Sequence, residues 1–180
     1  MKRFLPSRRT YLKTLHWGII PFFVWFLFAD PDALRRMGKW YFRFHSVMGL
    51  IFVVLSLIWT ADYLWRGLAS RPGPKLQGWA RRFHHYVHRI IIWGLFLVAF
   101  GGFLLGLTST VTLWAGGIIP IAPPQGLPKA NDIVGHAHTY QFYALAALIL
   151  AHAAFHIWRH VVLRDNALRI MAPKALHKWL

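Results

Sequence analysis

Residues 138–152 read HTYQFYALAALILAH, an apolar segment that begins and ends with a histidine. At 100° per residue, the spacing between His138 and His152 is close to four full helical turns. Both side chains therefore point to the same side of a helix, separated along its axis by about 21 Å. The sequence thus predicts a helix that presents one histidine near each of its ends, on a single face.

Working outward from this segment, the chain contains four apolar segments, at about 15–29, 44–65, 90–107 and 137–163. A helix needs roughly 20 residues to cross a bilayer, so the first segment must include the turn before His16. Only 14% of the residues are charged, against about a quarter in soluble domains. We therefore expect residues 1–180 to form a single all-α integral membrane domain, a bundle of four transmembrane helices.

The segments between the apolar runs carry clear helix-breaking signals. Asp30-Pro31-Asp32 ends the first run, and Arg71-Pro72-Gly73-Pro74 predicts a turn or linker. The stretch from Pro120 to Pro128 is too rich in proline and glycine to form one regular helix.

The composition excludes several classes of protein. The chain has no cysteine, which rules out disulfides, thiolate metal sites and iron–sulfur clusters. The formal net charge of +16 would suggest nucleic acid in a soluble protein. Here the basic residues cluster between apolar runs, so we expect no nucleic-acid partner. The basic N-terminus leads into an apolar run without a small-residue cleavage site, so no cleavable signal is predicted.

The distribution of lysine and arginine predicts the orientation in the membrane. With four spans, residues 1–15, the 66–89 segment and the tail from 159 share one side of the bilayer. They hold 16 of the 21 Lys and Arg residues, including Lys2 and Arg3. The opposite side holds Arg35, Arg36, Lys39, Arg43 and Lys129. Because cytoplasmic loops carry the excess of positive charge, both termini are expected in the cytoplasm, with the chain in the bacterial inner membrane.

Eleven histidines are more than a plain membrane bundle requires. His16 lies at the inner start of the first helix and matches His152 in depth. His45 lies at the outer start of the second helix and matches His138. Iron held by two axial imidazoles needs one histidine on each side of a porphyrin, and facing helices of a bundle supply such pairs. The pattern predicts two haem sites, one near each membrane face.

The histidines also allow other interpretations. Zinc or copper is the competing metal, but no acidic ligand accompanies the four residues, and 21 Å suits two separate centres. His136 could replace His138, although it lies about 160° away from the face of His152. An interfacial histidine most often contacts lipid headgroups, and His84, His85, His160 and His177 are assigned mainly to that role. His88 and His156 could each serve a haem propionate or a quinone, or be satisfied polar residues.

Five stretches together resemble the prokaryotic cytochrome b561 family over nearly the whole chain. They are Leu15-His16-Trp17, Phe44-His45-Ser46-Val47-Met48-Gly49, His138, Ala151-His152-Ala153-Ala154, and the tail from Arg164 to Pro173. The resemblance implies a four-helix bundle with two haems b, with His16 and His152 as iron ligands of the inner haem. It assigns His45 and His138 to the outer haem.

The resemblance also implies a function. Members of the family pass electrons between a periplasmic donor and ubiquinone, and in a superoxide oxidase of the family the donor is superoxide. We therefore expect an oxidoreductase with the bilayer, ubiquinone and a small anionic donor or redox protein as partners. The alternative is a cytochrome b anchor subunit of a hydrogenase or formate dehydrogenase type of complex. A third possibility is a haem-free structural protein.

Two groups of residues are candidates for the substrate sites. Three arginines come shortly before His45 in the sequence: Arg35, Arg36 and Arg43. Their positive charge could steer superoxide toward the outer haem, or they could contact lipid phosphates instead. On the inner side, a quinone and proton-relay role is predicted for His88, His156, Arg159 and His160, near Arg81, Arg82 and His85. The apolar, proline-rich 110–130 loop could cover the outer haem, enter the lipid or meet a partner subunit.

Overall fold

The computed structural model describes residues 6–115 and 118–179. Lys2 and Arg3, which entered the prediction of orientation, lie outside the described residues. Four long helices dominate the fold: α1 (Arg8–Phe28), α3 (Lys39–Arg66), α4 (Gly78–Leu107) and α5 (Pro128–Val161). Each is long and apolar enough to cross a membrane, so the four-span prediction is confirmed.

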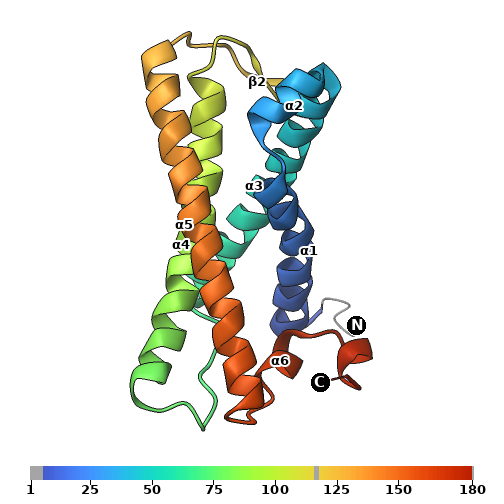
Figure 1. Cartoon of the computed structure of the whole chain (residues 1–180), viewed down its shortest axis with the longest axis vertical. Coiled ribbons are helices and arrows are strands. Elements are labelled where there is room, and N and C mark those ends of the chain that lie inside the picture. Colours follow the sequence, from blue (N-terminus) through green and yellow to red (C-terminus); the bar gives the residue numbers. More distant parts are fainter. Residues whose placement is uncertain (1–5, 116–117, 180) are drawn as a thin grey trace.

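Short elements connect the spans. α2 (Pro31–Met37) links α1 to α3, and the strands β1 (Leu113–Ala115) and β2 (Ile119–Ala122) form an antiparallel hairpin between α4 and α5. The helix α6 (Ala167–Met171) and the 3₁₀ turn Lys174–Leu176 follow α5. In Figure 1, α2 and β2 lie at one end of the bundle, and α6 and both chain ends lie at the other. This arrangement is the one expected of four successive crossings.

Every long helix starts before the apolar segment that predicts it. α1 begins at Arg8, where the Ser7 hydroxyl accepts a hydrogen bond from the Thr10 amide. α4 begins at Gly78, three turns ahead of the predicted start near residue 90. These first turns are polar or basic, so hydrophobicity alone does not detect them, although they continue the helix beyond the hydrocarbon.

The predicted breaks are confirmed. α1 ends at Phe28, just before Asp30, and Pro31 opens α2, where a proline costs no helical hydrogen bond. α2 and α3 meet at Gly38, whose φ of 139° is accessible to glycine far more readily than to other residues. The Pro120–Pro128 stretch contains β2 and ends where α5 begins.

An apolar layer at mid-height joins all four spans. Its buried members are Ile19 and Phe23 of α1, Phe52 of α3, Leu95 and Val98 of α4, and Leu145 and Ala146 of α5. Leu145 is seven residues from both His138 and His152. The layer therefore lies about 10 Å along the helix from each of the two histidine depths.

The end of the bundle that carries the termini is held together by polar contacts. Arg8 donates to Asp62 of α3 at 2.7 Å, and Lys13 and Trp17 of α1 donate to the carbonyls of Ala172 and Met171, each at 2.7 Å. The tail after α5 is thus tied to α1, the helix that carries His16.

Candidate functional site

Two histidines occupy the level near the termini. His16 of α1 packs edge-on against Trp59 of α3, with ring centroids 6.0 Å apart. His152 of α5 packs against His88 of α4 with centroids 4.7 Å apart. His16 and His152 are within electrostatic range of each other. The structure therefore brings together the inner pair that the sequence predicts, across the bundle between α1 and α5.

A second pair occupies the opposite level. His45 of α3 lies edge-on to Phe26, with centroids 5.0 Å apart, and is within electrostatic range of His138. The ring of His138 packs onto a glycine surface of α4. A Cβ on Gly101 would lie 3.0 Å from Nδ1 of His138, and one on Gly102 would lie 3.3 Å from Cε1. Glycine at these positions leaves the room that the imidazole occupies.

The two pairs fit a flat group held between imidazoles. Among the described residues, Nδ1 of His152 is buried without a hydrogen-bond partner, which is costly unless another group satisfies the ring. Within the same part of the chain, neither α1 and α5 nor α3 and α5 belong to the closely packed helix pairs. The helices that carry each pair are instead linked through their neighbours, since α1 packs on α3, α3 on α4 and α4 on α5.

A third group of histidines lies between α4 and α5. Ring nitrogens of His84, His88 and His156 all lie within 4.8 Å of one another. His84 is 0% exposed, so its assignment to the membrane interface is wrong. The first turns of α4 bring His84 between α4 and α5. The sequence does not predict this, because the apolar segment that predicts the helix begins near residue 90, six residues after His84.

The outer basic residues gather beside the His45 level. Arg35 and Arg36 lie in the last turn of α2, and Arg43 lies in the first turns of α3. All three side chains are exposed, and Arg35 is within electrostatic range of His45. His136 is at the surface, with its side chain 72% exposed and 3.6 Å from Asp132. Its exposure leaves His138 as the better-placed histidine of α5 at this level.

The predicted inner residues separate into two sets. Arg81, Arg82 and His85 line an open hollow of about 340 Å³ together with Pro72 and Tyr86. Arg159 is buried inside the bundle, whereas His88, His156 and His160 are each half-buried.

Arg159 is held by an acidic partner. Its guanidinium donates two hydrogen bonds to Oδ2 of Asp165, at 2.8 and 2.7 Å, and the two side chains are 1% and 3% exposed. The Arg159 side chain also packs against the 71–74 turn. A Cβ added to Gly73 would lie only 3.2 Å from Nη2 of Arg159.

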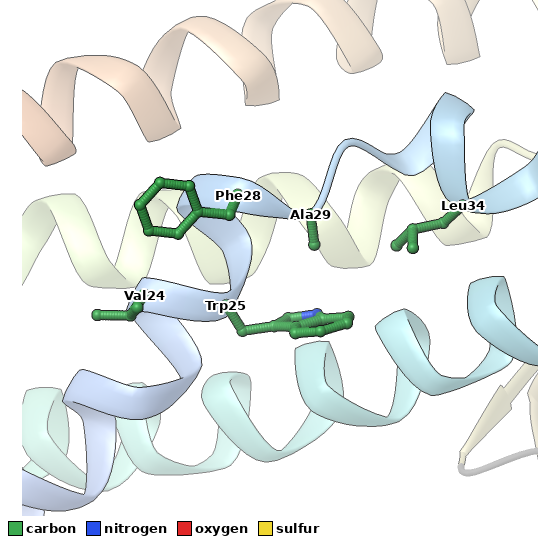
Figure 2. Close-up of a pocket in the computed structure, with 5 residues that line it drawn as sticks. All are labelled: Val24, Trp25, Phe28, Ala29 and Leu34. Carbon is green, nitrogen blue, oxygen red and sulfur yellow. The ribbon is translucent and has the colours of Figure 1, made fainter.

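A second hollow lies on the flank of the bundle. It has a volume of about 390 Å³ and is lined by Val24, Trp25, Phe28, Ala29 and Leu34, from α1 and α2. Figure 2 shows the Trp25 ring extending toward α3, with Phe28 directed to the other side. These side chains offer no group for acid–base or redox chemistry, so the hollow is an apolar recess on the flank of the bundle.

Four membrane-spanning helices with a pair of partly buried histidines near each end define a membrane cytochrome b. The family model of prokaryotic cytochrome b561 matches residues 8–174. The chain therefore belongs to the prokaryotic cytochrome b561 family, as its motifs predict, and is a multi-pass membrane dihaem cytochrome that transfers electrons. No curated protein matches the sequence.

Proposed function

We propose that the chain oxidises superoxide at its outer face and reduces membrane ubiquinone at its inner face. The reaction consumes two superoxide anions, one quinone and two protons, and it yields two O₂ and one quinol. The observation that carries the proposal is the separation of two unlike sites at opposite ends of the bundle. Exposed arginines lie beside the His45 level, and a hollow rimmed by aromatic and basic side chains lies near the His152 level.

The haem ligands in this proposal are His16 with His152 and His45 with His138. Haem b held by such pairs would supply reversible one-electron chemistry. The chain's own residues set the conditions: the glycines of α4 fit against His138, and Trp59 and Phe26 hold His16 and His45 edge-on. Both termini are proposed to lie in the cytoplasm, because the terminal side carries most of the basic residues.

At the outer face, Arg35, Arg36 and Arg43 attract the anionic donor. A positively charged mouth raises the local concentration of a small anion and can increase its on-rate by about 10–10³-fold. Because exposed charges are screened within about 10 Å at 0.1 M salt, the effect falls as salt is added.

Changing Arg35, Arg36 and Arg43 together to glutamine is expected to lower superoxide-driven quinone reduction by about tenfold or more at low salt, and to flatten its salt dependence. The measurement is the initial rate of quinol formation across a range of ionic strength. The control carries Arg9, Arg169 and Lys178 changed to glutamine, which removes the same charge from the opposite end. Equal rates and equal salt slopes for the two variants would contradict steering.

At the inner face, the hollow of Pro72, Arg81, Arg82, His85 and Tyr86 is proposed to admit the quinone head group. Protons for the quinol reach it through imidazoles, the side chains that exchange protons most readily near neutral pH. The candidate relay residues are His88, His156 and His160. Arg159 acts as a positioning residue in this proposal, since Asp165 neutralises its charge.

The direct test of the function is quinol formation by the purified haem-loaded protein in the presence of a superoxide source. Quinol should form at half the rate of superoxide loss, and superoxide dismutase should abolish it. Quinol formation that persists with superoxide dismutase would exclude superoxide as the donor.

A second function is favoured by one surface. The hairpin between α4 and α5 exposes apolar side chains at the end that also carries the arginines, among them Val111, Trp114, Ile118, Ile119 and Ile121. Such a patch suits a partner subunit, as in the anchor of a larger redox complex. Recovery of the chain from native membranes in a stoichiometric complex with a redox subunit would favour this alternative.

A further inference from the structure

The His84–His88–His156 group is not needed by the four proposed haem ligands. It lies between α4 and α5, and its member on α5 is His156, one turn beyond His152. Its three imidazoles come from two helices, with His84 and His88 one turn apart on α4. Three neutral nitrogens from two rigid helices are the donor set of many zinc sites.

The hydrogen bonds of the group prepare its rings for metal binding. Nδ1 of His88 lies 2.6 Å from the carbonyl oxygen of His84, and because a carbonyl only accepts, Nδ1 carries the proton. Nε2 of His88 is then the nitrogen with a lone pair, which can accept a hydrogen bond from Ser70 Oγ at 3.3 Å or bind a metal. A ligand histidine held in its tautomer by a backbone carbonyl is the usual outer-shell arrangement at metal sites.

Two further nitrogens of the group are buried and unsatisfied. Within the described residues, Nδ1 of His84 and Nε2 of His156 have no hydrogen-bond partner. Ser70 Oγ lies 3.1 Å from Nε2 of His84 and 3.3 Å from Nε2 of His88, so a hydroxyl also adjoins the group. Buried donors and acceptors without partners are uncommon in folded proteins, and here two of them belong to the same three-histidine group.

The distances suit a small cation after a modest closure. A tetrahedral Zn²⁺ with bonds of about 2.0–2.1 Å holds its ligand atoms about 3.4 Å apart. The ring nitrogens, which lie within 4.8 Å of one another, need to close by roughly 1.4 Å at most. The nearby positive charge of Arg159 does not oppose a cation in full, because Asp165 is hydrogen-bonded to it at 2.7 Å.

We propose that His84, His88 and His156 form a binding site for a divalent metal ion of the zinc class, with Ser70 or water completing the coordination. With no anionic ligand in the group, binding is weaker than at a thiolate site, so the metal is exchangeable. A metal bound there occupies ring nitrogens of His88 and His156. It would therefore remove two of the imidazoles of the proposed proton relay.

The test uses the haem-loaded protein in detergent, treated with chelator and titrated with Zn²⁺ by calorimetry, with metal content measured after gel filtration. The expected result is about one Zn²⁺ per chain bound by nitrogen ligands in the zinc X-ray absorption spectrum. His84→Ala should weaken binding by about a hundredfold or more, with unchanged haem content. The matched control is His85→Ala, which changes the partly exposed neighbour on α4 and should bind as the unaltered protein does.

A second variant, His156→Gln, keeps the test decisive if His84→Ala does not fold. The proposal is overturned if the unaltered protein binds no more Zn²⁺ than these variants, or if zinc binds only as haem is lost from the Soret spectrum. Because zinc binding is read without quinone, its failure is distinct from failure of the proposed electron-transfer reaction.

Discussion

Alanine at any one of His16, His45, His138 or His152 is expected to reduce the protohaem content from about two per chain to about one. Each iron would be held by an imidazole from both sides, so removing one imidazole removes half of the ligand set of that site. The remaining pair lies about 21 Å away along the helices, so it should retain its own haem. A pyridine haemochrome assay on the purified variants measures this directly.

The control for this prediction is His136→Ala. His136 is on the same helix as His138 but is 72% exposed and contacts Asp132, so its loss should leave both haems in place. Gel filtration and circular dichroism of each variant distinguish loss of a haem from loss of the fold. If all four ligand variants retain about two protohaems per chain, the assignment of these histidines as haem ligands is wrong.

Asp165→Asn is expected to destabilise the protein by about 3–5 kcal/mol, because it leaves the buried guanidinium of Arg159 without a compensating charge. The pair is almost fully buried, with side chains 1% and 3% exposed. Asp165 also accepts a hydrogen bond from the Ala167 amide at 3.0 Å, which fixes the start of α6. The free energy of unfolding in detergent, followed by circular dichroism in denaturant, gives the measurement.

Two comparisons sharpen this prediction. Replacing both Arg159 and Asp165 by leucine should be less damaging than Asp165→Asn, since no charge remains buried. Asp132→Asn, in the exposed His136–Asp132 pair, should change stability little, as surface pairs usually do. If Asp165→Asn is as stable as the unaltered protein, the ion pair is not what secures the end of α5.

The sequence was sufficient for those features that depend on local patterns. Hydrophobicity and helix-breaking residues predict the four spans and the breaks at Asp30 and Pro120. The 100° spacing puts His138 and His152 on one face, and the structure brings each near its predicted partner. Such patterns are properties of one segment at a time, and a bilayer makes them strong.

Features that depend on how segments meet were not predicted. The burial of His84 requires α4 to begin at Gly78 and to pack its first turns on α5, which no local pattern reveals. The Arg159–Asp165 pair forms because the chain reverses after α5, with Arg164 and Asn166 at φ values of 49° and 58°. The sequence predicts only a loop where the short apolar hairpin forms, because strands of three and four residues show too little periodicity to be recognised.

The apolar layer around Phe23, Phe52 and Leu145 separates the two histidine levels of the bundle with hydrocarbon side chains. Each electron that passes between the ends traverses about 21 Å of a hydrocarbon core roughly 30 Å thick, with no ion moving alongside it. One elementary charge moved through 100 mV corresponds to about 2.3 kcal/mol. In the proposed reaction, turnover is therefore electrogenic: it builds the transmembrane voltage in one direction and is driven by it in the other.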